Sequence, residues 1–271
     1  MPMYIPHAKY PKSHKEFNVI KMNPGLFSKI DLKDFTITLS SRVIDFFASQ
    51  TFLYSSKFQE NYGSKLVMLL SAVERSNGQW TSLESILKSQ KFRSAIKLCA
   101  TGEKAFSLID ETVEEYLDNF GSIRSVVNFY TKNLTFLEKK LFISGVLYLQ
   151  TYKRKKIKDG LMLTPVSVQD PKEFEKDDEK RINYKLSKRL KEVIYSIRNY
   201  FVHNAEYIPY PDQKYIDGRK YFRFTTYKNG LPYKDWLIGL PFEQFYKITN
   251  KAFERFWLRE YEKSKRKTST D

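Results

Sequence analysis

The stretch INYKLSKRLKEVIYSIRNYFVHNAE, residues 182–206, decides the fold that this chain adopts. Apolar residues recur in it every three or four positions, which is the spacing of one buried helix face. They are Leu186, Leu190, Val193, Ile194, Ile197 and Phe201. The stretch therefore predicts one long helix that packs this apolar face into a hydrophobic core.

Helical periodicity also dominates the segments on both sides of this helix. We expect helices over about 40–60 and 63–76, two helices within 122–152 that separate near 133–135, and a last helix over 241–262. Residues 221–238 instead have the composition of a β-hairpin around Asn229-Gly230, a pair typical of tight turns. The sequence therefore predicts a mainly α fold: a helical bundle with a helical insertion and one small C-terminal β-hairpin.

Proline and charge divide the chain into three parts. Residues 1–39 hold four prolines and little helical periodicity, so we expect an extended N-terminal arm with one short strand over 35–39. Residues 40–262 are expected to form a single helical domain, in which 78–160 is a helical elaboration, 153–180 an exposed connector and 219–238 the hairpin. Residues 263–271 are expected to form a disordered basic tail.

The net charge of +16 is the main functional indication in the composition. Such an excess of positive charge attracts polyanions, and nucleic acid is the partner that it predicts. An anionic membrane surface is the weaker alternative, and a third interpretation is that the lysines only increase solubility. The apolar runs are too short for a spanning helix, so no membrane partner is expected.

Cysteine and histidine are scarce in this chain. Cys99 is the single cysteine and has no partner for an internal disulfide, and no leader-like segment opens the sequence, so a cytoplasmic location is expected. His7, His14 and His203 lack the spacing of zinc ligands, and no glycine-rich nucleotide-binding loop is present. The sequence predicts neither a metal nor a cofactor.

The motif that carries chemistry lies late in the predicted long helix and consists of Arg198, Asn199 and His203. A guanidinium binds phosphate, an amide donates a directed hydrogen bond, and an imidazole transfers protons near neutral pH. Residues four apart on a helix lie about 40° apart, whereas residues five apart lie about 140° apart. Asn199 and His203 therefore share a face, and two copies of the motif across a symmetric dimer would assemble a better site than one.

The arrangement Arg198-Asn199-x3-His203 in a helical protein resembles the signature of the HEPN superfamily. A second segment agrees, because Leu69-Leu70-Ser71-Ala72-Val73-Glu74 is similar to the apolar-Ala-apolar-Glu helix of several HEPN families. The resemblance implies a HEPN-like helical bundle and a metal-independent endoribonuclease that acts as a homodimer. Proteins of this kind serve as toxins or antiviral defence effectors, so an antitoxin or other regulatory partner is a further expectation.

The resemblance also implies a role for each motif residue. His203 would transfer protons while the RNA's own 2′-hydroxyl attacks, and Arg198 would bind the scissile phosphate. Asn199 would orient either the imidazole of His203 or the phosphate. Glu74 would either pair with Arg198 or join two helices. Products would carry a 2′,3′-cyclic phosphate, and DNA would stay intact.

Basic and aromatic residues near the motif are candidates for RNA binding. Cations neutralise backbone phosphates, and exposed aromatic rings stack on unpaired bases. The candidates are Lys188, Arg189, Lys191, Tyr195 and Tyr200 in the motif helix, together with Lys153, Arg154, Lys155 and Lys156. Three alternatives stay open: His203 and Arg198 are structural, at a helix end and in an ion pair; the protein is a non-catalytic RNA- or protein-binding module; or it binds DNA.

Overall fold

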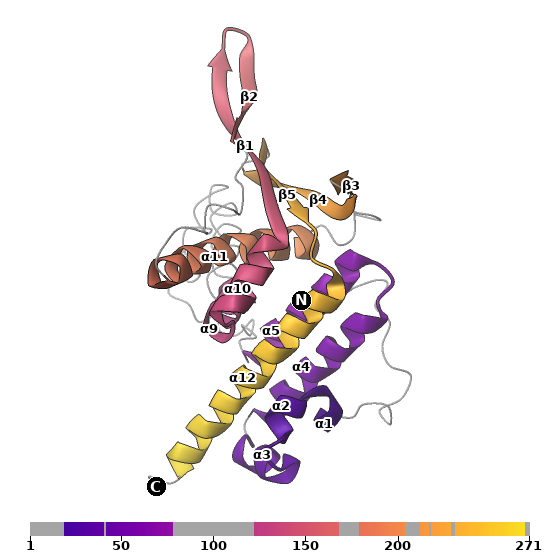
Figure 1. Ribbon diagram of the computed structural model, residues 1–271, viewed down its shortest axis with the longest axis vertical. Coiled ribbons are helices and arrows are strands. Elements are labelled where there is room, and N and C mark those ends of the chain that lie inside the picture. Colours follow the sequence, from indigo (N-terminus) through magenta and orange to yellow (C-terminus); the bar gives the residue numbers. More distant parts are fainter. Residues whose placement is uncertain are drawn as a thin grey trace, which may run out of the picture.

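The computed structural model describes residues 19–40, 42–77, 122–167, 179–203, 212–216, 218–228 and 231–268. These residues form a mostly helical structure with a small antiparallel sheet (Figure 1). The helices are α1 (Val19–Met22), α2 (Pro24–Phe27), α3 (Leu32–Thr38), α4 (Val43–Ser55), the 3-10 helix η2 (Ser56–Phe58), α5 (Tyr62–Ser76), α9 (Ser122–Asn133), α10 (Phe136–Ser144), α11 (Glu179–His203) and α12 (Phe242–Thr268). The strands are β1 (Val146–Ile157), β2 (Gly160–Ser167), β3 (Asp212–Ile216), β4 (Arg219–Lys228) and β5 (Leu231–Ile238).

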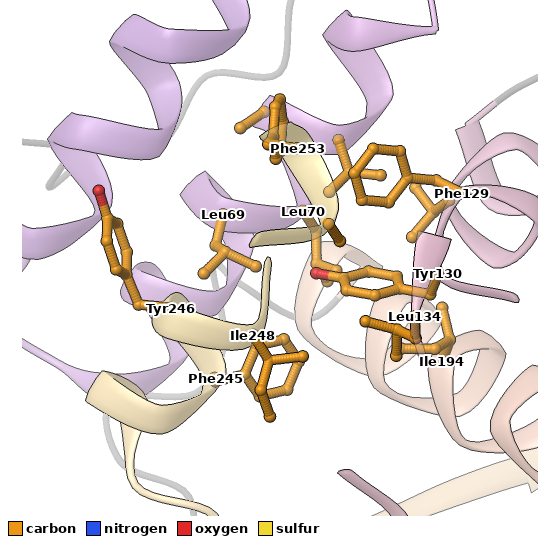
Figure 2. Close-up of a cluster of buried hydrophobic side chains, with 14 of the residues drawn as sticks. Leu69, Leu70, Phe129, Tyr130, Leu134, Ile194, Phe245, Tyr246, Ile248 and Phe253 are labelled. Carbon is orange, nitrogen blue, oxygen red and sulfur yellow. The ribbon is translucent and has the colours of Figure 1, made fainter. Parts of the chain in front are cut away.

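The main core lies where α5, α9, α11 and α12 meet (Figure 2). Leu70, Tyr130, Ile194 and Phe253 contribute to it from these four helices, and each is fully buried. The hydroxyl of Tyr130 lies 2.9 Å from that of Thr249, and burial raises the pKa of Tyr130. The six apolar residues predicted to form the buried face of the long helix are all buried, which confirms that prediction.

Five antiparallel strands form one sheet in the order β2-β1-β5-β4-β3. The predicted hairpin exists as β4 and β5, but it is part of this larger sheet and not an isolated feature. The first half of β1 pairs with β5, and its second half pairs with β2. A Cβ at Gly145 would lie 2.8 Å from Leu240, so glycine permits the close approach that places β1 beside β5.

The prediction for residues 122–152 is half right. Two helices separate near Thr135, whose side chain forms a capping box with Glu138 at the start of α10. The second helix ends at Ser144, however, and residues 146–157 form a strand. The expected exposed connector over 153–180 is likewise a β-hairpin as far as Ser167, and its remainder up to 178 lies outside the described residues. Of the expected helical elaboration over 78–160, residues 78–121 lie outside the described residues and 146–157 are not helical.

Both ends of the described chain are more helical than predicted. The strand expected over 35–39 is wrong, because α3 occupies most of that segment and Asp31 caps it by accepting a hydrogen bond from the Lys33 amide at 2.8 Å. Phe35 is fully buried, with its ring 4.8 Å from that of Phe46. At the other end α12 continues to Thr268, so most of the tail predicted to be disordered is helical. Residues 1–18 and 269–271 lie outside the described residues.

Candidate nucleic-acid interface

A cavity of about 990 Å³ opens between α9, α11 and the β4–β5 hairpin. We name it the tyrosine groove, because four tyrosines line it together with four cations, one carboxylate and several uncharged residues. The tyrosines are Tyr195, Tyr200, Tyr227 and Tyr233; the charged residues are Arg124, Lys191, Lys228, Lys234 and Glu192; the others are Ile123, Val127, Ser196, Asn199, Thr225 and Thr226. Cations thus outnumber carboxylates in the lining, and a polyanion is the favoured type of ligand.

One face of α11 forms the floor of the tyrosine groove. Lys191, Tyr195 and Asn199 follow one another at intervals of four residues, so they align along the helix. The opposite face carries the buried apolar residues that anchor the helix in the core. Tyr195 is 47% exposed, so its ring is available to a ligand. The helical periodicity that predicts α11 therefore also places Lys191, Tyr195 and Asn199 on the face away from the core.

The ring of Tyr200 lies between the tyrosine groove and the sheet. Its centroid is 4.7 Å from that of Phe224, and burial is the main cause of the raised pKa of Tyr200. The sheet holds the Tyr200 ring, which therefore forms a rigid aromatic wall of the groove. The Tyr195 ring, in contrast, is exposed.

Lys234 is the most unusual cation of the site. Its ammonium group forms an ion pair with Glu192 and lies 5.0 Å from the ring centre of Tyr233. Glu192 is shared with Arg189, whose guanidinium lies 2.7 Å from it. Burial, followed by the charge of Arg189, lowers the pKa of Lys234 to about 8. This lysine therefore changes its charge at a pH where an ordinary lysine stays protonated.

Arg198 lies outside the tyrosine groove. Its Nε is 3.3 Å from Oε1 of Glu74 on α5, and the two side chains are only 11% and 18% exposed. Of the two roles expected for Glu74, the structure thus contains the pair with Arg198, and the pair joins α5 to α11. Because Glu74 belongs to the same chain, a second copy is not needed to place Arg198. Arg198 and Asn199 do not line the same cavity, since successive helix residues point about 100° apart.

Asn199 is the motif residue that reaches the tyrosine groove. Its Oδ1 is buried and has no hydrogen-bond partner among the described residues. A buried amide oxygen without a partner costs free energy, and a donor on a ligand would remove that cost. His203 is the last residue of α11, one turn beyond Asn199, and its side chain lies outside the described residues.

The remaining candidates for RNA binding divide into three groups. Lys191, Tyr195 and Tyr200 line the tyrosine groove. Arg189 lies outside the lining, with its guanidinium 5.4 Å from the ring centre of Trp236, and Lys188 is exposed on α11, also outside the lining. The basic residues 153–156 are exposed on β1, also outside the lining.

The sequence did not reveal the half of the tyrosine groove that lies outside α11. Tyr227, Lys228, Tyr233 and Lys234 come from the β4–β5 hairpin, and Arg124 comes from α9. A signal was present, because tyrosine and lysine flank the predicted Asn229-Gly230 turn on both sides. The packing of this hairpin against α11, which brings the two parts of the lining together, could not be predicted from the sequence.

Within the part of the chain that the structure describes, no group of His, Cys, Asp or Glu side chains could hold a metal ion. Among the described helices, none combines the length and apolar character needed to cross a membrane. The scan against protein-family models and the searches of curated proteins and of solved structures found no match to this chain.

Proposed function

We propose that this protein binds unpaired RNA in the tyrosine groove and cleaves it without a metal ion, as a HEPN-type endoribonuclease does. The observation that carries the proposal is the gathering of four tyrosines and four cations in one groove, whose lining includes Asn199 with its buried amide oxygen lacking a hydrogen-bond partner among the described residues. Each ring offers a stacking surface to an unpaired base, and the cations neutralise the phosphates between the bases. Asn199 supplies an acceptor for an N–H group on a base or for a 2′-hydroxyl.

His203 is the residue that we assign to proton transfer. It follows Asn199 by four residues, which on a helix corresponds to the same face. The resemblance assigns the scissile phosphate to Arg198, but the pair with Glu74 favours a different division of roles. In our proposal the cations of the tyrosine groove stabilise the phosphate, and Arg198 holds α11 against α5. Homodimer formation, a toxin or antiviral role and a regulatory partner remain proposals from the resemblance alone.

A second candidate function is an RNA-binding module without catalytic activity. The pair of Arg198 with Glu74 favours it, because a guanidinium held in this way is less available to bind phosphate. This module would use the same groove, and the two functions differ only in whether bound RNA is cut.

One experiment tests the proposal and separates the candidates. Purified protein is incubated in EDTA with unpaired RNA, and cleavage and affinity are measured in parallel for wild type and for His203→Ala. We expect wild-type products that end in 2′,3′-cyclic phosphate, no cleavage by His203→Ala, and equal affinity in both. Intact RNA with both proteins, bound tightly by each, would establish the module, and equal cleavage by both proteins would remove His203 from the mechanism.

A matched pair of variants tests whether the tyrosine groove is the RNA site. Tyr195→Ala removes an exposed ring inside the groove, whereas Tyr184→Ala removes a ring that is 72% exposed on the same helix outside it. Loss of one stacked base costs about 1 to 3 kcal/mol, so Tyr195→Ala should weaken binding roughly 5- to 150-fold. Tyr184→Ala should bind like wild type, and an equal loss in both variants would place the RNA elsewhere.

A further inference from the structure

The β1–β2 hairpin projects from the sheet as a two-stranded ribbon (Figure 1). We name residues 152–165 the basic arm. At about 3.4 Å per residue, its β1 strand extends roughly 17 Å from Tyr152 to Ile157. Most of this ribbon is exposed, so its side chains are available to a partner, and their chemistry indicates which kind.

Positive charge covers both faces of the basic arm. Five of the six positions from 153 to 158 hold cations, and the sixth is Ile157. Asp159 is the single acidic residue in 152–165. The cations are Lys153, Arg154, Lys155, Lys156 and Lys158, and all of them are exposed. Because successive side chains of a strand point to opposite faces, Lys153 and Lys155 lie on one face, and Arg154 and Lys156 on the other. None of the five forms an ion pair within the described residues.

Exposed apolar side chains gather at the end of the basic arm. Ile157, Leu161 and Met162 are 48%, 53% and 46% exposed. Leu161 pairs with Lys156 across the hairpin, and Met162 pairs with Lys155, so each face combines apolar contact area with a cation. Such a surface suits a ligand that is charged at its edges and less polar between them.

The basic arm begins at the mouth of the tyrosine groove. Nη2 of Arg154 donates a hydrogen bond of 3.2 Å to the carbonyl oxygen of Lys228, which lines the groove. At the root of the arm, the hydroxyl of Tyr152 donates to Oδ2 of Asp235 at 2.8 Å. Thr225, also in the groove lining, donates to Oδ1 of the same carboxylate at 2.6 Å. A polyanion that contacts Lys228 in the groove would therefore have Arg154 of the arm beside it.

We propose that the basic arm binds the minor groove of a base-paired RNA stem, next to the unpaired segment held in the tyrosine groove. This inference rests on the proposed function and defines its substrate class as RNA with a stem beside an unpaired segment. A ribbon that is basic on both faces fits between the two rows of phosphates of a duplex. A single-stranded RNA has one row of phosphates and would contact only one face of the ribbon. The minor groove of an RNA helix is wide and shallow, so it admits the ribbon and presents sugars and base edges to the apolar side chains.

The test compares three RNAs in the His203→Ala background, so that cleavage does not interfere: an unpaired strand, a stem with an unpaired overhang, and the same stem without an overhang. We expect the stem with the overhang to bind tightest. The variant Lys155→Ala/Lys156→Ala removes one cation from each face of the basic arm. The matched control Lys29→Ala/Lys33→Ala removes two exposed lysines around α3, at the opposite end of the molecule from the arm (Figure 1).

The arm variant should weaken binding to the stem with the overhang at least about tenfold at 0.1 M salt, and should leave the unpaired strand unaffected. The slope of log K against log salt should fall by roughly 1.5 to 2 for two lost phosphate contacts. The control should match its parent protein. If the stem adds no affinity, or if the arm variant weakens all three RNAs equally, the inference is overturned while RNA binding in the tyrosine groove stands. If none of the RNAs binds, the proposed function fails as well.

Discussion

Arg198 and Asn199 are neighbours in the sequence, yet they serve different parts of the molecule. The guanidinium of Arg198 turns to Glu74 on α5, while the amide of Asn199 reaches the tyrosine groove. The sequence could place both residues on one helix, but the choice of face depends on what packs beside the helix. The pair of Arg198 with Glu74 is therefore a contact that the motif alone does not reveal.

Removing the carboxylate of Glu74 should destabilise the fold more than it affects RNA binding. Glu74→Ala removes the carboxylate that pairs with a mostly buried guanidinium, so we expect the free energy of unfolding to fall by about 1 to 3 kcal/mol. Urea denaturation of Glu74→Ala, Arg198→Ala and the double variant measures the coupling of the pair. If Arg198→Ala abolished cleavage without lowering stability, Arg198 would be catalytic and our division of roles would be wrong.

The lowered pKa of Lys234 predicts a particular pH dependence for the proposed RNA binding. Burial and the charge of Arg189 lower this pKa to about 8, and a bound phosphate would raise it, so RNA binding takes up a proton. Affinity should therefore be greatest below pH 8 and decline as the pH rises from 8 to 9.5. Fluorescence anisotropy with uncleavable 2′-methoxy RNA measures this decline. Lys234→Arg, which stays charged, should remove it; a parallel decline in both proteins would assign the effect to another group.

Among the elements, β1 shows best why part of the fold could not be predicted. Residues 122–144 form the two expected helices, but the chain then changes to a strand at Val146, within a segment whose apolar residues also suit a helix. The pairing of Val146 to Thr151 with β5 decides the outcome, and β5 is more than 80 residues further along the chain. Such a long-range contact leaves no local periodicity, whereas the apolar face of α11 is local and was predicted correctly.

The junction of β1, β4 and β5 depends on Asp235. This side chain is 3% exposed and accepts hydrogen bonds from Tyr152, Arg223 and Thr225. Burial alone would raise the pKa of Asp235, but these hydrogen bonds outweigh it and hold the pKa below the ordinary value. Asp235→Asn should lower the free energy of unfolding by about 2 to 3 kcal/mol, because it loses the charge that strengthens all three bonds.

Thermal unfolding of Asp235→Asn beside Thr226→Ala provides the measurement. Thr226 lies on the same strand as Thr225 and makes only a 3.3 Å hydrogen bond to the carbonyl oxygen of Lys234, so its loss should cost much less. Equal stability of the two variants would show that Asp235 is not the centre of this junction.

For the molecule as a whole, the net charge of +16 should appear as a strong salt dependence of RNA binding. Four cations line the tyrosine groove, and each phosphate contact with a single strand contributes about 0.7 to the slope of log K against log salt. We therefore expect a slope of about −3 for unpaired RNA between 50 and 300 mM salt. A slope near zero would mean that the cations do not contact phosphates and that the positive charge serves solubility alone.

The sequence predicted the helical class, the long motif helix and the β4–β5 hairpin, because each rests on periodicity or turn chemistry within a short segment. It placed Lys191, Tyr195 and Tyr200 among the candidates, and these three line the tyrosine groove. It missed Lys234 and Tyr233, whose importance arises only when the sheet packs against α11. The groove is a product of tertiary packing, so its second half could not be read from any one segment.

The way in which the basic arm is rooted also bears on how this protein could change during evolution. Its root is fixed by Asp235, while its outer part contributes nothing to the core. We therefore expect the fold to tolerate insertions and deletions in the arm, provided that the alternation of faces is kept. Related chains should accordingly differ in this hairpin by two residues in each strand, four in total, while the residues around Asp235 vary little. If the arm binds an RNA stem as proposed, changes of this kind would alter the length of stem that it accepts and leave the tyrosine groove as it is.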